Sequence, residues 1–449
     1  MNILSLIEKK KHGKALSPDE ISYIVNGYTK GDLPDYQLSA FLMAVWFRGM
    51  DEEETYHLTM SMMHSGDMMD LSSLGLTIDK HSTGGIGDKL TLIDAPIWAA
   101  SGLFVAKMSG RGLGFTGGTI DKMESVRGCD VTLTPEKFLS LVKENHIAVT
   151  GQSQNLVPAD KKLYALRDVT ATVDSLPLIA SSIMSKKLAT SADILVLDVK
   201  FGRGSFMKTK EDATALAKAM IKIGKKAKRK VAALLSPMDH PLGYHVGNAL
   251  EVKEAYDLLG GRGNQNLMKH SLFLGALGFY AAGVCDHLEE SLVLTKQYIS
   301  DGSGQKKLCD MFRSQGGQFQ GLDLCSALNL PEDGVPVISC KEGYVTNIDA
   351  LAIGTTAMNL GAGRKILTDE IDHSAGIVLA KSVGDTVQSG EILAWLYGKK
   401  VPKELLIQAR DAFSLGEKEE VPPDNSGTVL IGEEQMELKG VIHKLLVNS

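Results

Sequence analysis

Cysteine is scarce in this sequence, and long apolar runs are missing. No stretch approaches the length that a membrane-spanning helix requires. The first residues, MNILSLIEKKKHGK, place lysines after a short apolar run, which is the reverse of a secretory signal peptide. The five cysteines form no CxxC pair, so they indicate neither a zinc site nor a disulfide framework, and they suit a reducing compartment. We therefore expect a cytoplasmic protein that binds no membrane.

The chain also lacks an excess of basic residues. Its 449 residues include 54 acidic and 48 basic side chains, which give a net charge of -6. Nucleic acids and anionic membranes favour a basic protein surface, so we expect no nucleic-acid partner, and any anion site must be built locally. Hydrophobic residues make up 44% of the chain and charged residues 23%. These values are typical of a globular protein, and the length predicts two or three lobes.

The spacing of apolar residues changes twice along the chain. Residues 1–65 carry apolar side chains at helical spacing, and Ser17 before Pro18 predicts a capped helix start. From about residue 75, short apolar strands such as ADILVLDVK (192–200) precede glycine-rich loops and helices. This order predicts a parallel sheet with ligands at the carboxyl ends of its strands. After about residue 335 the pattern shifts again, and residues 376–398 predict a structural β-hairpin.

Two glycine-rich loops carry residues suited to bind an anion. Residues 80–92 read KHSTGGIGDKLTL and residues 107–124 read KMSGRGLGFTGGTIDKME, and each combines lysine with serine and threonine after a predicted strand. Glycines let backbone N–H groups approach an oxyanion, and lysines supply positive charge. Either loop alone could be only a turn, but the two together favour a shared phosphate site.

A dinucleotide-binding motif can also be read in the second loop. Gly112, Gly114 and Gly117 match GxGxxG, but the segment that follows is too short for the long helix this motif requires. Neither loop matches the Walker A pattern. We therefore discount a dinucleotide site.

A third segment, SQNLVPADKKLYALRDVTATVDSLPLIASSIMSKK (153–187), contains Arg167, Ser182 and Lys186. Such charged residues commonly lie on the surface. Here, however, the preceding run is apolar and rich in serine, so its lysines follow a helix that should be substantially buried. A lysine in that position favours a polar ligand.

Together with GNALEVKEA, these motifs resemble the thymidine and pyrimidine-nucleoside phosphorylase family (nucleoside phosphorylase class II), from the N-terminal helices to about residue 400. The resemblance implies an α/β protein with a small α-helical lobe (1–65 and 159–190) and a larger α/β lobe (70–155 and 191–335) with a mixed, mostly parallel sheet. A C-terminal α+β subdomain (336–449) would pack on the α/β lobe. It also implies a homodimer formed through the N-terminal helices.

The implied reaction is the reversible phosphorolysis of uridine, deoxyuridine or thymidine to the free base and ribose or deoxyribose 1-phosphate, without an organic cofactor. By resemblance, the catalytic residues are His81, Arg167 and Lys186. The pyrimidine contacts are Arg167, Ser182 and Lys186. The phosphate contacts are Lys80, His81, Ser82, Thr91, Lys107, Met108, Ser109 and Thr119.

The resemblance further implies a structural potassium ion, and it identifies several departures from the family pattern. The matching potassium positions are Gly87, Lys89, Leu242, His245 and Glu254, with Lys89 standing where threonine is usual. The other departures are Phe115, Gln154, Phe201 and Arg203. We expect them to bear on closure of the cleft and on the preference at the sugar 2′ position.

Two other functions stay open at this point. An anthranilate-type phosphoribosyltransferase shares the predicted architecture, but it would need magnesium and an acidic motif that we do not find in the sequence. A non-catalytic binding relative would keep the fold, although the intact lysine, serine and arginine positions speak against it.

Overall fold

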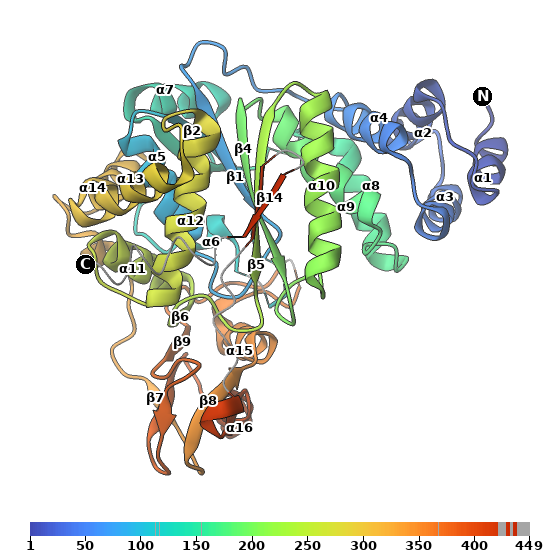
Figure 1. Cartoon of the computed structure of the whole chain (residues 1–449). Helices are drawn as coiled ribbons and strands as arrows, with labels where there is room; N and C mark the ends of the chain where they lie inside the picture. Colours follow the sequence, from blue (N-terminus) through green and yellow to red (C-terminus); the bar gives the residue numbers. More distant parts are fainter. Residues whose placement is uncertain are drawn as a thin grey trace.

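The computed structural model describes residues 1–112, 114–115, 117–153, 155–366, 368–420, 428–431 and 434–437. Helices from two parts of the sequence form one side of the molecule (Figure 1). They are α1 (Ile3–Lys11), α2 (Pro18–Lys30), α3 (Asp35–Arg48), α4 (Glu52–Met63), α8 (Pro158–Val169) and α9 (Leu176–Ala189). Ser17 starts α2 with the expected cap, because its hydroxyl accepts a hydrogen bond from the Glu20 N–H. α9 packs against both α4 and α10 (Lys210–Lys226), and it thereby joins the N-terminal helices to the rest of the fold.

A seven-stranded sheet with the order β14-β13-β5-β4-β1-β2-β3 lies at the centre of the molecule. The parallel strands are β1 (Thr77–Ser82), β2 (Phe104–Ser109), β3 (Ile147–Gly151), β4 (Ile194–Phe201) and β5 (Lys230–Pro237). β13 (Thr428–Ile431) pairs antiparallel with β5 and with β14 (Glu434–Glu437). The predicted α/β fold with a mixed, mostly parallel sheet is confirmed.

Alternate residues of the parallel strands face two different hydrophobic cores. Ile194 and Val196 of β4 face a core formed with α5 (Leu90–Ala100), α11 (Asn248–Leu259), α12 (Gln265–Ala282), α13 (Leu288–Ser300) and α14 (Ser303–Ser314). Leu195 and Leu197 face a second core, which includes α7 (Pro135–Asn145), α10 and the helices on the N-terminal side. Burial on both faces explains why residues 194–197 read as a continuous apolar run.

The carboxyl ends of β1 and β2 lead directly into the two glycine-rich loops. Residues 83–89 connect β1 to α5, and residues 110–118 connect β2 to α6 (Thr119–Glu124). Because β1 and β2 are parallel neighbours, both loops begin at the same edge of the sheet. α6 has only six residues, in agreement with the short segment on which we rejected a dinucleotide motif.

The C-terminal part forms two antiparallel sheets, labelled in the lower part of Figure 1. One contains β6 (His245–Gly247), β9 (Gly376–Leu379), β11 (Ile392–Tyr397) and β7 (Val335–Ile338), and the other contains β10 (Thr386–Val387), β8 (Gly343–Ile348) and β12 (Phe413–Gly416). The helices of this part are α15 (Ala350–Ala357) and α16 (Lys403–Asp411). The predicted hairpin over 376–398 is divided between them, because β9 pairs with β11 while β10 pairs with β8. None of the described helices is both long and apolar enough to cross a membrane.

Candidate active site

The predicted phosphate residues lie on two neighbouring strands and at the starts of the helices that follow them. Lys80, His81 and Ser82 end β1, and Lys107, Met108 and Ser109 end β2. Thr91 is the second residue of α5, and Thr119 is the first residue of α6. The side chains of Lys80 and Lys107 are 2% and 4% exposed, so the fold buries two lysines at this edge of the sheet.

Lys80 lies between two carboxylates without engaging either closely. Its Nζ is 3.4 Å from Asp88 Oδ1 and 3.9 Å from Asp198 Oδ2. Asp198 is bound more closely by Lys200 Nζ, at 2.7 Å, and by the Ser236 hydroxyl, which donates to it at 2.6 Å. Since N–H···O hydrogen bonds are usually about 2.7–3.2 Å long, the Lys80 ammonium keeps hydrogen-bonding capacity for another anion.

Lys187 attaches helix α9 to both strands. Its Nζ lies 2.9 Å from Asp79 Oδ2 on β1 and donates to the Met108 carbonyl on β2 at 3.2 Å. Lys107 shares both partners: its Nζ lies 3.6 Å from Asp79 Oδ1 and 3.1 Å from the Met108 carbonyl oxygen. Two lysines thus share one carboxylate, and positive charge is left in excess where an oxyanion would bind.

Lys107 is expected to make anion binding depend on pH. Burial lowers the pKa of Lys107 to about 7, with the charge of Lys187 acting in the same direction and that of Asp79 opposing it. The ammonium form, which attracts an anion, is present below pH 7 and is lost as the pH rises through this value. We expect the Kd of sulfate, which stays a dianion here, to rise by up to about tenfold per pH unit above pH 7. Isothermal titration calorimetry from about pH 6 to about pH 9 measures this change.

The Lys107→Arg variant is the matched control for that titration. A guanidinium stays protonated over the whole range, so its sulfate Kd should vary less with pH than that of the wild type. A wild-type Kd that is constant from about pH 6 to about pH 9 would contradict the assignment.

His81 lies among the same positive charges. Burial lowers the pKa of His81 well below its ordinary value, and the charges of Lys187, Lys107, Lys186 and Lys80 lower it further. The ring is therefore a neutral imidazole near pH 7, which can donate one N–H hydrogen bond but carries no proton to give away as an acid.

Asp121 holds the second glycine-rich loop in place. Its Oδ2 accepts a hydrogen bond from the Gly112 N–H at 2.6 Å, and its Oδ1 accepts from Arg364 Nη1 at 2.8 Å. Gly118 has no space for a side chain, because a Cβ there would lie 2.1 Å from Gly112 N. The Arg364 carbonyl also accepts a hydrogen bond from the Gly114 N–H at 2.9 Å. A residue of the C-terminal part therefore fixes the shape of this loop.

Ser182 and Lys186 lie one turn apart on α9 and face Asp160 of α8. Lys186 Nζ donates to the Ser182 hydroxyl at 3.1 Å and forms an ion pair with Asp160 Oδ2. Ser182 and Asp160 are buried, whereas the Lys186 side chain is 23% exposed. The Lys186 side chain is therefore only partly covered by the protein.

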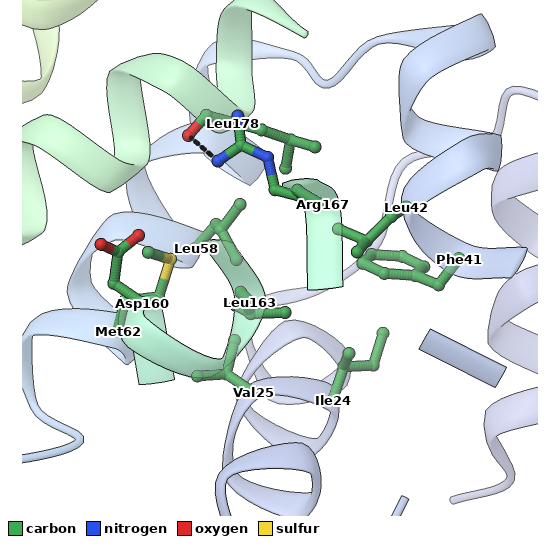
Figure 2. A pocket seen from close by; sticks show the side chains of 10 residues that line it. All are labelled: Ile24, Val25, Phe41, Leu42, Leu58, Met62, Asp160, Leu163, Arg167 and Leu178. Atoms are coloured by element: carbon green, nitrogen blue, oxygen red, sulfur yellow. Dashed lines mark hydrogen bonds between the residues drawn. The ribbon is translucent and has the colours of Figure 1, made fainter. Parts of the chain in front are cut away.

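Arg167 is buried near the end of α8, and its guanidinium holds the connection to α9. Figure 2 shows it at one side of an apolar cavity of about 20 Å³, with the guanidinium directed at the Leu178 carbonyl. Nη1 donates to Leu178 O at 3.1 Å, Nε to Thr172 O at 3.2 Å and Nη2 to Val173 O at 2.5 Å. A guanidinium has five N–H donors, and among the described residues none accepts from the other two. Arg167 therefore combines a structural role with two donors left for a ligand.

The residues predicted to bind potassium do meet, but they surround the ammonium group of Lys89. Its Nζ donates to the carbonyls of Leu242 and His245, both at 2.8 Å, and to Glu254 Oε2 at 2.5 Å. Gly87 lies against this group, because a Cβ there would be 2.6 Å from Leu242 O. The oxygens that a cation would require already accept hydrogen bonds from Lys89. These residues do not fit a bound potassium ion, and we assign none to the protein.

Three segments of the chain match known families. Residues 4–66 match the glycosyl transferase family, helical bundle domain; residues 74–305 match the glycosyl transferase family, a/b domain; and residues 344–414 match the pyrimidine nucleoside phosphorylase C-terminal domain. The pyrimidine-nucleoside phosphorylase of Geobacillus stearothermophilus is 53% identical over 401 residues, which cover 89% of this chain and 93% of that protein. The chain belongs to the pyrimidine-nucleoside phosphorylase family. Two further relatives of that name are each 50% identical: the Staphylococcus haemolyticus protein (91% of this chain, 97% of that protein) and the Bacillus subtilis protein (89% and 93%).

The fold of this pyrimidine-nucleoside phosphorylase family member also occurs in a solved structure. Anthranilate phosphoribosyltransferase from Thermus thermophilus superposes with a TM-score of 0.57 and 19% identity, over 69% of this chain and 98% of that one. At this identity the likeness shows a shared fold alone. Because relatives at 50% identity and above are named phosphorylases, the phosphoribosyltransferase alternative is not favoured.

The structure shows where the residues lie that depart from the expected family pattern. Phe115 and Phe201 are partly buried and pack against the two cores. Arg203 is exposed, and its Nη1 lies 3.8 Å from Asp349 Oδ2 of the C-terminal part. Gln154 lies outside the described residues.

The sequence analysis assigned no role to Asp79, Lys187 and Asp198, although the two aspartates carry a recognisable pattern. Asp198 interrupts the apolar strand ILVLDVKF, and Asp79 precedes Lys80 in a strand with a buried face. Charged residues are almost never fully buried unless they are paired, so a carboxylate inside an apolar strand indicates a buried cation. That rule would have directed attention to Lys187 and Lys200.

Proposed function

We propose that this protein catalyses the reversible phosphorolysis of pyrimidine nucleosides, with uridine, deoxyuridine and thymidine as substrates. The products are the free base and ribose or deoxyribose 1-phosphate. The main support is that Lys107 of β2 shares Asp79 and the Met108 carbonyl with Lys187 of α9, and the same helix carries Ser182 and Lys186. An anion and a pyrimidine can therefore be held next to each other.

In the proposed reaction, a phosphate oxygen forms a bond to the anomeric carbon while the bond from that carbon to the base nitrogen breaks. The electron pair of the broken bond passes to the base and is shared with its carbonyl oxygens, and the released base anion takes up a proton from water. Lys80 and Lys107 hold the phosphate, assisted by the other predicted phosphate contacts, Ser82, Thr91, Met108, Ser109 and Thr119. Positioning and charge stabilisation then provide the rate enhancement.

The base would be held by Ser182, Lys186 and the two remaining N–H donors of Arg167. The Lys186 ammonium stabilises the negative charge that develops on the base, and Ser182 orients that ammonium through their hydrogen bond. His81, as a neutral ring, donates a hydrogen bond to a base carbonyl rather than a proton. No organic cofactor takes part in this scheme, and inorganic phosphate is the co-substrate.

Base release followed by ultraviolet absorbance tests the proposed function. We expect thymidine, deoxyuridine and uridine to release free base only when phosphate is added. Cytidine serves as a comparison substrate, and phosphoribosyl pyrophosphate with magnesium and free base tests the transferase alternative. If folded protein releases no base from any nucleoside in the presence of phosphate, the proposed function is wrong.

We also infer a homodimer formed through the N-terminal helices. Leu4 of α1 and Tyr36 and Phe47 of α3 are 59%, 73% and 71% exposed, which is unusual for a group of large apolar side chains on neighbouring helices. A second copy of this chain would bury them. Light scattering coupled to gel filtration should give a mass near twice 48.3 kDa, and a monomer mass would contradict the inference.

We place the protein in the cytoplasm. All five cysteines are unpaired in the structure, which suits a reducing compartment. Recovery of the protein in an oxidising extracellular fraction of cells would contradict this location.

A further inference from the structure

We propose that the Lys89 ammonium is a built-in substitute for a monovalent cation, which keeps the first glycine-rich loop ordered without potassium. Lys89 lies at the end of that loop, directly before α5, and its side chain is 0% exposed. The inference does not depend on which nucleoside is cleaved, because it concerns the stability of the fold around the loop.

Every N–H donor of the Lys89 ammonium group has an acceptor in the structure. A lysine ammonium has three N–H donors and no acceptor. Here three oxygens receive them: Leu242 O at 2.8 Å, His245 O at 2.8 Å and Glu254 Oε2 at 2.5 Å. A potassium ion bound to the same oxygens would lie close to the ammonium and be repelled by it. The lysine and a cation therefore exclude each other.

Lys89 connects parts of the molecule that are distant in sequence. The Leu242 N–H donates to the Ile86 carbonyl at 2.9 Å, which joins the loop to the segment 242–245. In that segment the Tyr244 and His245 N–H groups donate to the Glu254 carboxylate of α11, at 2.6 and 3.0 Å. His245 also begins β6, which pairs with β9 of the C-terminal part. One ammonium group thus joins the loop, α11 and the C-terminal part.

The charge of the site is balanced only while Lys89 is present. Glu254 is 2% exposed; burial would raise the pKa of Glu254, but the charge of Lys89 and the hydrogen bond of His245 outweigh it and lower this pKa to about 2. His245 Nδ1 is 3.5 Å from Glu254 Oε2. Without Lys89, one carboxylate and two carbonyls would face a vacated space. Hard oxygen ligands of this kind suit an alkali or alkaline-earth cation.

Thermal unfolding in two salts tests the proposal. We expect the wild-type Tm to agree within about 1 °C in potassium chloride and in choline chloride at equal ionic strength. Lys89→Thr should lower the Tm in choline chloride by about 3–6 °C, because Glu254 is left buried without a partner. Potassium chloride should restore at least half of that loss in this variant, since potassium ions bind the folded state only.

The double variant Lys89→Met with Glu254→Gln is the matched control, because it removes the ammonium and the carboxylate together. Its Tm should be the same in both salts. A wild-type Tm that is clearly higher in potassium chloride than in choline chloride would overturn the proposal, and this arm needs no substitution. A folded Lys89→Thr protein with equal Tm values in both salts would overturn it as well.

Discussion

The Lys186→Ala variant is expected to lose about 100- to 1000-fold in kcat/KM for the phosphate-dependent release of thymine from thymidine. The reason is that Lys186, beside Ser182 and Asp160, supplies positive charge at the proposed position of the leaving base. Because the Lys186 side chain is partly exposed, the variant should still fold. Steady-state kinetics with a range of phosphate and thymidine concentrations measures the effect.

Two controls separate catalysis from packing in that experiment. Lys186→Ala leaves Asp160 buried without its ion-pair partner, so a combined Lys186→Met and Asp160→Asn variant removes both charges. The combined variant should regain thermal stability but not activity. Lys161→Ala, at an exposed lysine on α8, should keep wild-type kinetics. Lys186→Ala protein with near wild-type kcat/KM would remove Lys186 from the mechanism.

The Arg167→Ala variant is expected to lower the free energy of unfolding by about 3–5 kcal/mol as well as the activity. The substitution removes three donors from the carbonyls of Thr172, Val173 and Leu178, and buried carbonyls without donors are costly. It also enlarges the apolar cavity beside Arg167 (Figure 2). Urea unfolding measures the first effect, and the KM for thymidine measures the second.

Arg167→Lys distinguishes the two roles of this side chain. A lysine keeps the charge but cannot make the three divergent hydrogen bonds of the guanidinium. If Arg167 acts mainly on the backbone, Arg167→Lys should be destabilised nearly as much as Arg167→Ala. If Arg167→Ala unfolds with the same urea midpoint as the wild type, the three hydrogen bonds contribute little to stability.

The sequence predicted the fold class because its apolar spacing changes where the architecture changes. Local chemistry determines the helical spacing of 1–65, the apolar run at the start of β4 and the glycine loops after β1 and β2, and a single sequence displays all three. The predicted limits of the helical lobe (1–65 and 159–190), the α/β lobe (70–155 and 191–335) and the C-terminal subdomain (336–449) stay predictions. Contacts between distant segments, such as Arg364 with Asp121, carry no local pattern and were not foreseen.

Lys89 illustrates what the sequence could not provide. Its replacement of the usual threonine was visible, and so was its extra charge. The direction of its side chain was not, and that direction decides whether Lys89 lines a cation site or fills it. Only the three oxygens around its Nζ answer this question.

The adjacency of Lys186 and Lys187 on α9 has a consequence for how the two substrates stay aligned. Lys187 is bound to Asp79 on β1 and the Met108 carbonyl on β2, while Lys186 faces Ser182 and Asp160, where we propose that the base binds. Consecutive Cα atoms are always about 3.8 Å apart. In the proposed reaction, the anchor to the phosphate strands and the base contact therefore belong to adjacent residues of one helix, so a movement of α9 carries both together.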